Sequence, residues 1–217
     1  MQLNSFNIFG ITGGIGYSFF NEIKDKGLKI CGFYHSNDKM ISQIKLSDNI
    51  SLRRIDMGIP SGIKEIDIPN YEGLLYAVGK PHFGKNIFDF QESELQAQMN
   101  MSINSLFVIL QKLCSRDNVS LKRVVVISSI CPEVIDSLYH IVKQMQSEFL
   151  RVLRQVLNNR NIGLSIIKAG WVKTKMFDEY IRITGKKPRS AIEPIIIAKH
   201  CIEEFEREGL FNEAILV

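Results

Sequence analysis

Short apolar runs alternate along the chain with segments in which apolar residues recur every three or four positions. The runs have the length of strands, and the other segments have the spacing of helices. We expect strands at residues 6–11, 28–34, 50–55, 73–78, 122–128, 163–168 and 214–217. We expect helices from residue 15 to the glycine at 27, and at residues 93–113, 138–157 and 192–207.

Strands and helices alternate over most of this pattern. Strands that are apolar on both faces, separated by helices, are typical of a parallel sheet with helices on both of its faces. The pattern therefore predicts an α/β fold with a doubly wound parallel sheet of about seven strands. The 217 residues contain no internal repeat and no linker, so we expect a single domain over residues 1–217.

Composition and charge exclude several classes of function. The net charge is +4 and the basic residues are scattered, without the basic stripe of a nucleic-acid protein. No apolar stretch is long enough to span a membrane, and the first residues do not resemble a secretory leader. The cysteines have no metal-ligand spacing, which predicts no metal site and buried thiols in a reducing cytoplasm; they are Cys31, Cys114, Cys131 and Cys201.

A glycine cluster, Gly10-Ile11-Thr12-Gly13-Gly14-Ile15-Gly16, follows the first expected strand and opens the first helix. At the start of a helix the backbone N–H groups point to a common spot and carry about half a positive charge, which suits a pyrophosphate. Gly10 permits a tight turn, Gly14 lets a ligand approach the backbone, and Gly16 lets the helix pack on the strand. A glycine-rich turn without a ligand is the alternative.

Tyr139 and Lys143 lie four residues apart in an expected helix, after a strand that ends at Ser128-Ser129. Residues at this spacing share a helix face. The pKa of a phenol, about 10, must fall by roughly 3 units before it exchanges protons readily at neutral pH. A fixed ammonium nearby supplies part of the required energy. The alternative is a surface tyrosine beside a solvated lysine.

The order Gly-x-x-x-Gly-x-Gly, then Ser…Tyr-x-x-x-Lys, resembles the short-chain dehydrogenase/reductase family over nearly the whole chain. The resemblance implies a Rossmann-type NAD(P)-binding domain that transfers hydride between NADP(H) and a small carbonyl or alcohol substrate. It makes Tyr139 the acid/base, Lys143 the residue that tunes it and holds the cofactor ribose, and Ser129 the residue that orients the carbonyl, with Ser128 as a substitute. It also implies a homodimer or homotetramer formed through two long helices.

The resemblance also assigns cofactor contacts. Thr12 and Ile15 belong to the glycine turn, Asp56 matches a residue that binds adenine, and Gly79 ends the fourth strand. Val172 and Thr174, in Ala169-Gly170-Trp171-Val172-Lys173-Thr174, match residues that hold the nicotinamide carboxamide. No acid ends the second strand, where His35 and Ser36 stand with Asn37 and Lys39 close by. We therefore expect NADP rather than NAD, although His35 can equally be an ordinary loop residue.

Five residues depart from the family pattern: Phe9, Tyr76, Ala77, Ser102 and Ala169. Ser102 stands where many members have an asparagine that relays protons through a water. These departures favour an alternative function, a nucleotide-binding regulator or scaffold with little turnover. A sugar-nucleotide epimerase or dehydratase needs a substrate domain for which the chain leaves little room. Phe177, Tyr180 and Ile183 form either a lid over the substrate or a helix docked on the surface.

Overall fold

The computed structural model describes residues 3–36, 38–130 and 137–217. Within these residues, seven strands form one parallel sheet in the order β3-β2-β1-β4-β5-β6-β7. The strands are β1 (Ser5–Phe9), β2 (Lys29–Tyr34), β3 (Ile50–Arg54), β4 (Gly73–Tyr76), β5 (Arg123–Ser129), β6 (Gly163–Ala169) and β7 (Phe211–Leu216). This is the strand order of a doubly wound Rossmann fold. The fold class expected from the sequence is confirmed.

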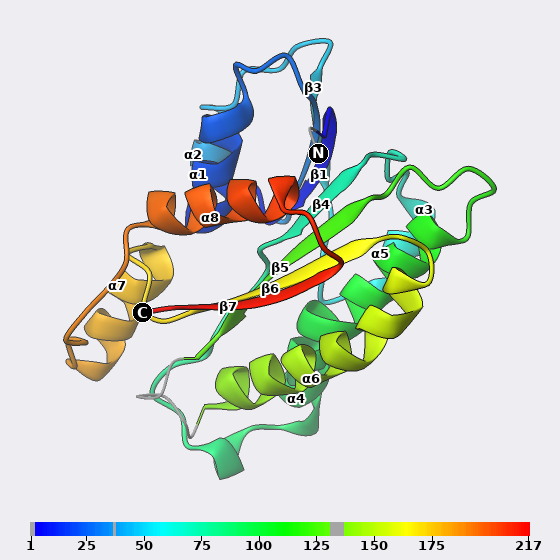
Figure 1. Cartoon of the computed structure of the whole chain (residues 1–217). Helices are drawn as coiled ribbons and strands as arrows, with labels where there is room; N and C mark the ends of the chain where they lie inside the picture. Colours follow the sequence, from blue (N-terminus) through cyan, green and yellow to red (C-terminus); the bar gives the residue numbers. More distant parts are fainter. Residues whose placement is uncertain (1–2, 37, 131–136) are drawn as a thin grey trace.

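Helices cover both faces of the sheet (Figure 1). One face is packed by α1 (Gly14–Ile23) and α8 (Pro194–Glu206). The other is packed by α3 (Pro60–Glu65), α5 (Ser105–Cys114) and α6 (Leu138–Asn158), with α4 (Glu92–Met99) against α6. Two short segments, α2 (Asp38–Ile41) and η1 (Ile87–Asp89), lie in connections, and α7 (Lys175–Thr184) follows β6. None of the helices in the described residues is both long and apolar enough to cross a membrane.

Three differences from the expected elements have physical causes. The strand expected at 214–217 begins at Phe211, because charged and amide residues can occupy an edge strand whose faces are only half-buried. The short helices α2 and α3 are too brief to give a helical period. The helix expected at 93–113 is interrupted by a π-helical turn, η2 (Asn100–Asn104), which joins α4 to α5.

Two of the departures from the family pattern form part of the core. The rings of Phe9 and Phe33 stack with their centroids 4.2 Å apart, and Tyr76 lies beside Phe9 with its centroid 6.0 Å away. All three side chains are fully buried. The Tyr76 hydroxyl donates a hydrogen bond to the Met101 carbonyl in η2, so this tyrosine ties β4 to the helix that crosses behind it.

The strand order creates the place for a site. β1 and β4 are neighbours in the sheet, but the chain leaves β1 toward β2 and leaves β4 toward β5. Connections on opposite faces leave a crevice beyond the carboxyl ends of these strands, where ligands of doubly wound folds bind. The glycine turn follows β1 and Gly79 follows β4, so both face this crevice.

Candidate active site

The glycine turn joins β1 to α1 in a backbone conformation that residues with a side chain could adopt only with strain. Gly10 has a φ of +85°, and a Cβ placed on it would lie 2.5 Å from the Ala77 carbonyl oxygen. A Cβ on Gly16 would lie 2.2 Å from the Gly10 carbonyl oxygen, so the helix packs directly on the turn. Because α1 begins at Gly14, the N–H groups of its first turn have no acceptor within the helix. They are available to an anion.

Two adjacent cavities of about 400 and 270 Å³ follow the carboxyl edge of the sheet. They share five lining residues, which are Thr12, Gly13, Ala77, Val78 and Gly79. The larger cavity continues to the helix α6 side and to the segment after β6, whereas the smaller one continues to the ends of β2 and β3. The two cavities therefore form one elongated cleft with the glycine turn near its middle.

The end of the cleft at β2 and β3 holds the residues expected at the adenosine half of a dinucleotide. His35 Nε2 lies 3.5 Å from the Asp56 carboxylate, and both side chains are exposed. The Thr12 hydroxyl donates to the Ser36 carbonyl at 3.1 Å, which links this loop to the glycine turn. Arg54 Nε donates to the His35 carbonyl at 3.1 Å. Arg54 was not expected at the site, since its position at the end of β3 gives no motif signal. Asn37 lies outside the described residues.

The other end of the cleft brings Tyr139 and Lys143 together. A Cβ on Gly79 would lie 2.8 Å from the Tyr139 hydroxyl oxygen, so the hydroxyl sits directly over the glycine that ends the β4 segment. Lys143 Nζ lies 5.7 Å from the centroid of the Tyr139 ring. Lys143 is 1% exposed, and burial lowers the pKa of its ammonium to about 7. The helix that carries both residues starts at the cap Ser137, whose hydroxyl accepts from the His140 N–H.

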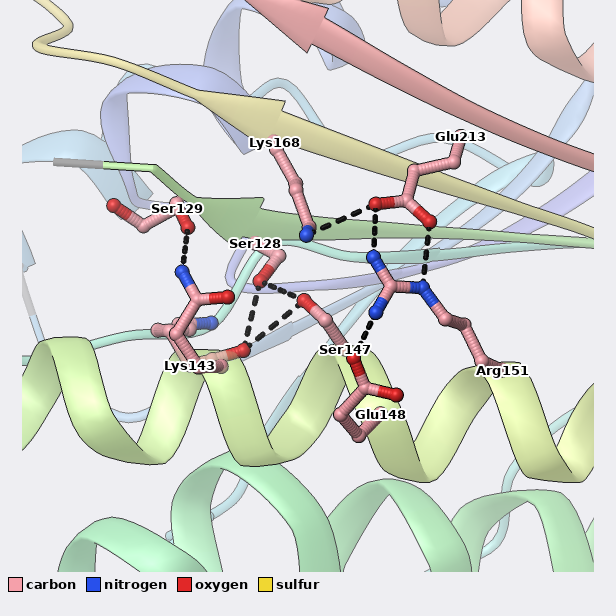
Figure 2. A network of polar contacts seen from close by, with 9 residues as sticks. Ser128, Ser129, Lys143, Ser147, Glu148, Arg151, Lys168 and Glu213 are labelled. Atoms are coloured by element: carbon pink, nitrogen blue, oxygen red, sulfur yellow. Dashed lines mark hydrogen bonds and ion pairs between the residues drawn. The ribbon is translucent and has the colours of Figure 1, made fainter.

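The two serines at the end of β5 are used differently (Figure 2). The Ser128 hydroxyl donates to the Lys143 carbonyl at 3.1 Å and lies 2.9 Å from the Ser147 hydroxyl, so it faces α6. Ser129 accepts a bond from Gln144 Nε2 on its backbone carbonyl, and Figure 2 shows its hydroxyl pointing away from Ser128. Both serines line the larger cavity. Ser128 is therefore bonded to α6 through its hydroxyl, whereas the bond from α6 to Ser129 reaches the backbone carbonyl.

Ser102 lies in the π-helical turn and is 1% exposed. Among the described residues its hydroxyl has no hydrogen-bond partner, but its backbone carbonyl accepts from Gln146 Nε2. The neighbouring Asn100 and Asn104 are bonded to each other, and Asn100 also donates to the Gly58 carbonyl. Ser102 is thus connected to Lys143 through Gln146, a residue on which the motif gives no information.

The segment after β6 closes the cleft opposite the glycine turn. A Cβ on Gly14 would lie 2.4 Å from the Thr174 methyl group, so the turn and this segment touch. Val172 and Thr174 both line the larger cavity. The segment is fixed by Lys173 N–H donating to the Ile192 carbonyl and by Ile192 N–H donating to the Trp171 carbonyl.

An aromatic wall lines the outer part of the larger cavity. The rings of Trp171 and Tyr180 lie with their centroids 4.2 Å apart, and Phe83 meets Tyr180 edge-on at 5.2 Å. Phe177 and Phe83 line the cavity, while Tyr180 is buried beneath it. α7 is therefore a helix docked on the Trp171 side of the cleft, with Phe177 turned to the cavity and Ile183 41% exposed. Cys131, expected to pack beside the site, lies outside the described residues.

Solved structures with the same architecture decide the fold. A short-chain dehydrogenase family protein from Francisella tularensis subsp. tularensis SCHU S4 matches with a TM-score of 0.79 and 16% identity, over 99% of this chain and 97% of that one. The chain has the fold of the short-chain dehydrogenases. A second solved structure, a 4-hydroxyisoleucine dehydrogenase mutant complexed with NADH and succinate, matches with a TM-score of 0.82 and 16% identity, over 98% of this chain and 96% of that one.

One further solved structure and one sequence relative also match the chain, whereas family models do not. L-Sorbose reductase from Gluconobacter frateurii, complexed with NADPH and L-sorbose, matches with a TM-score of 0.77 and 13% identity, over 99% of this chain and 95% of that one. By sequence, an uncharacterized oxidoreductase YmfI of Bacillus subtilis (strain 168) is 23% identical over 188 residues, which are 80% of this chain and 76% of the relative. No family model matches the sequence.

Proposed function

We propose that this protein is an NADP-dependent oxidoreductase that reduces a small carbonyl compound or oxidises the matching alcohol. The observation that carries the proposal is the position of Tyr139: its hydroxyl lies over Gly79, where the two cavities meet, beside the buried Lys143. We further propose that the chain acts as one domain in the cytoplasm. Three described cysteines, Cys31, Cys114 and Cys201, are unpaired, which suits a reducing compartment.

The residues present fit a nicotinamide dinucleotide. The first-turn N–H groups of α1 suit the pyrophosphate, with Gly10 and Gly16 providing the turn and Thr12 and Ile15 lining the cavity. Asp56 and Ser36 line the smaller cavity, where the adenosine would lie. Val172 and Thr174 would hold the carboxamide at the other end. The nicotinamide, when bound, supplies or accepts the hydride.

The protein's own residues then handle the proton. During carbonyl reduction, the Tyr139 hydroxyl gives its proton to the substrate oxygen as the carbon receives hydride. The Ser129 hydroxyl donates a hydrogen bond to the same oxygen and stabilises the developing negative charge. The Lys143 ammonium favours the phenolate that Tyr139 becomes. In the direction of alcohol oxidation, the Tyr139 phenolate takes the proton back.

The preference for NADP rests on the exposed residues at the ends of β2 and β3. Arg54 and His35 bring basic groups to the loop beside the smaller cavity. The Asp56 carboxylate also lies here, with an oxygen 3.5 Å from Nε2 of His35. An arginine near this position accommodates the 2′-phosphate in NADP-binding folds. Isothermal titration with NADPH and NADH tests the preference, and equal affinities would contradict it.

One observation favours the alternative function, a nucleotide-binding regulator with little turnover. Lys143 donates to three protein oxygens, on Val78, Ile127 and Gln146, so its ammonium is engaged before a cofactor arrives. A regulator needs only to bind the nucleotide and to present a different protein surface when the nucleotide is bound. Tight NADPH binding without turnover of any carbonyl substrate would favour this function over the oxidoreductase.

Replacing Tyr139 by phenylalanine separates the two functions. The substitution removes the proton donor and leaves the ring in place, so kcat should fall by about 10²- to 10⁴-fold. The dissociation constant of NADPH should change little. NADPH oxidation over a panel of aldehydes and ketones, with NADPH binding measured by fluorescence, checks both. Turnover that is unaltered in Tyr139→Phe, on a substrate accepted by the wild type, would overturn the assignment of Tyr139.

A further inference from the structure

The Lys143 ammonium is fully coordinated by the protein. Nζ donates to the Val78 carbonyl at 2.9 Å, to the Ile127 carbonyl at 3.1 Å and to Gln146 Oε1 at 3.1 Å. An ammonium has three N–H donors and no acceptor. All three donors are therefore in use, and Lys143 can bind a ribose hydroxyl only by exchanging one of these oxygens for it.

The three oxygens differ in their access to the cleft. Val78 and Ile127 line the larger cavity, and Val78 is only half-buried. Gln146 is 0% exposed and does not line either cavity. A ligand in the cleft can thus compete for the donors that point to Val78 and Ile127, whereas the contact with Gln146 lies behind the lysine and is retained.

Gln146 is itself fixed at both ends of its amide. Its Oε1 accepts from Lys143, one helical turn earlier on α6, and its Nε2 donates to the Ser102 carbonyl. Turning the amide over would bring its NH₂ group against an ammonium, which also has only donors. The chemistry of the two neighbours therefore allows one orientation, in which the amide oxygen faces Lys143.

The second anchor comes from an unusual piece of backbone. Ser102 lies in the π-helical turn Asn100–Asn104, and such turns occur frequently at functional sites. Two successive carbonyls of this turn accept bonds from side chains, Met101 from Tyr76 and Ser102 from Gln146. The Ser102 carbonyl is held in place by the helix, so it fixes Gln146, and Gln146 in turn fixes Lys143.

We infer that Gln146 is a positioning residue for Lys143: it holds the buried ammonium from behind and keeps it charged while a cofactor exchanges the contacts on the cleft side. The inference deepens the proposed function and rests on it. The pKa of Lys143, lowered to about 7 by burial, puts its charge within reach of small changes in its surroundings. The further titratable side chains that line the cavity of Lys143 are Tyr139 on its own helix and Lys175 on α7.

Two substitutions of Gln146 change the pKa of Lys143 in opposite directions. Gln146→Met keeps the approximate shape but removes the acceptor, so the pKa should fall by about one to two units. Gln146→Glu keeps the acceptor and adds a negative charge, so the pKa should rise by about one unit or more. A purely structural role of Gln146 does not produce shifts of opposite sign, even where both variants are less stable.

The pKa is measured on the cofactor-free protein by nitrogen NMR of the Lys143 Nζ atom, assigned by its loss in Lys143→Met. The matched control is Gln155→Met, the same exchange at an exposed position of the same helix, which should leave the pKa unchanged. A pKa of Lys143 that is the same in the wild type, Gln146→Met and Gln146→Glu overturns the inference.

Binding of two nucleotides separates this inference from the proposed function. NADPH carries the nicotinamide ribose that Lys143 would hold. Adenosine 2′,5′-bisphosphate has only the adenosine ribose and lacks the nicotinamide ribose. Gln146→Met should weaken NADPH about 5- to 10-fold and leave adenosine 2′,5′-bisphosphate unaffected. Equal weakening of both ligands contradicts the positioning role. If wild-type NADPH binds no more tightly than adenosine 2′,5′-bisphosphate, the proposed function fails, while opposite pKa shifts in the two variants still support the contact between Gln146 and Lys143.

Discussion

Gly79 determines where the Tyr139 hydroxyl can lie. The hydroxyl oxygen and two ring carbons of Tyr139 come within 3.4 Å of the position that a Cβ on Gly79 would take. Gly79 is also one of the five residues that line both cavities. Because Gly79 has a hydrogen atom where other residues have a Cβ, there is room for the phenol of Tyr139 beside the cleft.

Gly79→Ala should therefore lower kcat more than it raises KM. The added methyl group would lie 2.8 Å from the hydroxyl oxygen and displace the ring, and a misplacement of about 1 Å can cost about 10²-fold in rate. Steady-state kinetics on any substrate that the wild type accepts measures the effect. Gly62→Ala on α3 is the control, because no atom lies within 4 Å of its added Cβ. Full kcat in Gly79→Ala would contradict the assigned position.

α6 is held against the sheet by a charged cluster as well as by its apolar face (Figure 2). Glu213 on β7 binds Arg151 of α6 through both carboxylate oxygens, at 2.8 and 2.6 Å, and Lys168 of β6 at 2.9 Å. Lys168 has a side chain only 9% exposed. The hydrogen bonds from Arg151 lower the pKa of Glu213 to about 2, with Lys168 adding to the effect. The edge strand is thereby fixed to the helix that carries Tyr139.

Glu213→Gln should lower the free energy of unfolding at neutral pH. In acid the wild type and the variant should have similar stability. Removing the carboxylate leaves the Lys168 charge buried without its partner, at a cost of about 3 kcal/mol. The folded pKa of Glu213 lies below its unfolded value, so its contribution is present above about pH 4.5 and disappears toward pH 2. Urea unfolding of both proteins at several pH values checks this. Glu179→Gln, which removes an exposed pair with Arg182, should change stability little.

The interruption of the long helix shows what the sequence could not predict at the scale of elements. The apolar residues of α5 face the core at helical spacing, and no residue in the sequence marks where α4 passes into the π-helical turn. The extra width of the turn is stabilised by tertiary bonds from Tyr76 and Gln146, which lie far away in the sequence. The π-helical turn at Asn100–Asn104 could therefore not be predicted from the sequence, and Gln146 has no motif signal.

At the scale of the whole molecule, the alternation of strands and helices was enough to predict the parallel sheet and its two covered faces. The strand order was implied by the family resemblance, since periodicity carries no information on which strands are neighbours. The glycine turn, Tyr139 and the Thr174 segment meet at one cleft because all three follow carboxyl ends of parallel strands. Arg54 was missed because its position at the end of β3 gives no motif signal, and only the fold brings it to the carbonyl of His35.

The outer surface of the molecule carries an apolar face that suits the homo-oligomer implied by the family resemblance. α6 carries exposed apolar side chains along one face, of which Val152 is 76% and Val156 54% exposed. Met145, also on α6, is 41% exposed, and Phe107 of the neighbouring α5 is 46% exposed, so both extend this surface. Exposed apolar surface of this kind marks interaction sites. Phe149 and Leu153 of the same helix pack against the core.

Val152→Glu should weaken self-association. Placing a charge in the middle of an apolar interface leaves it desolvated and unpaired, so the dissociation constant of the oligomer should rise by about 10-fold or more. Analytical ultracentrifugation over a range of concentrations measures it. Val119→Glu, on the loop before β5, provides the same exchange at another exposed valine and should have no effect. A wild-type protein that is monomeric at all concentrations would contradict the oligomer.

The contact between Gly14 and the Thr174 methyl group has a mechanical consequence. The rim formed by the start of α1 and the rim formed by the segment after β6 already touch there, so neither can approach the other further without a clash. Thr174 is also the N-cap residue of α7. Inward movement of α7 over the aromatic wall is therefore blocked at its Thr174 end, beside the glycine turn, so this contact restrains the end of α7 that starts at Lys175 rather than the Gly185 end.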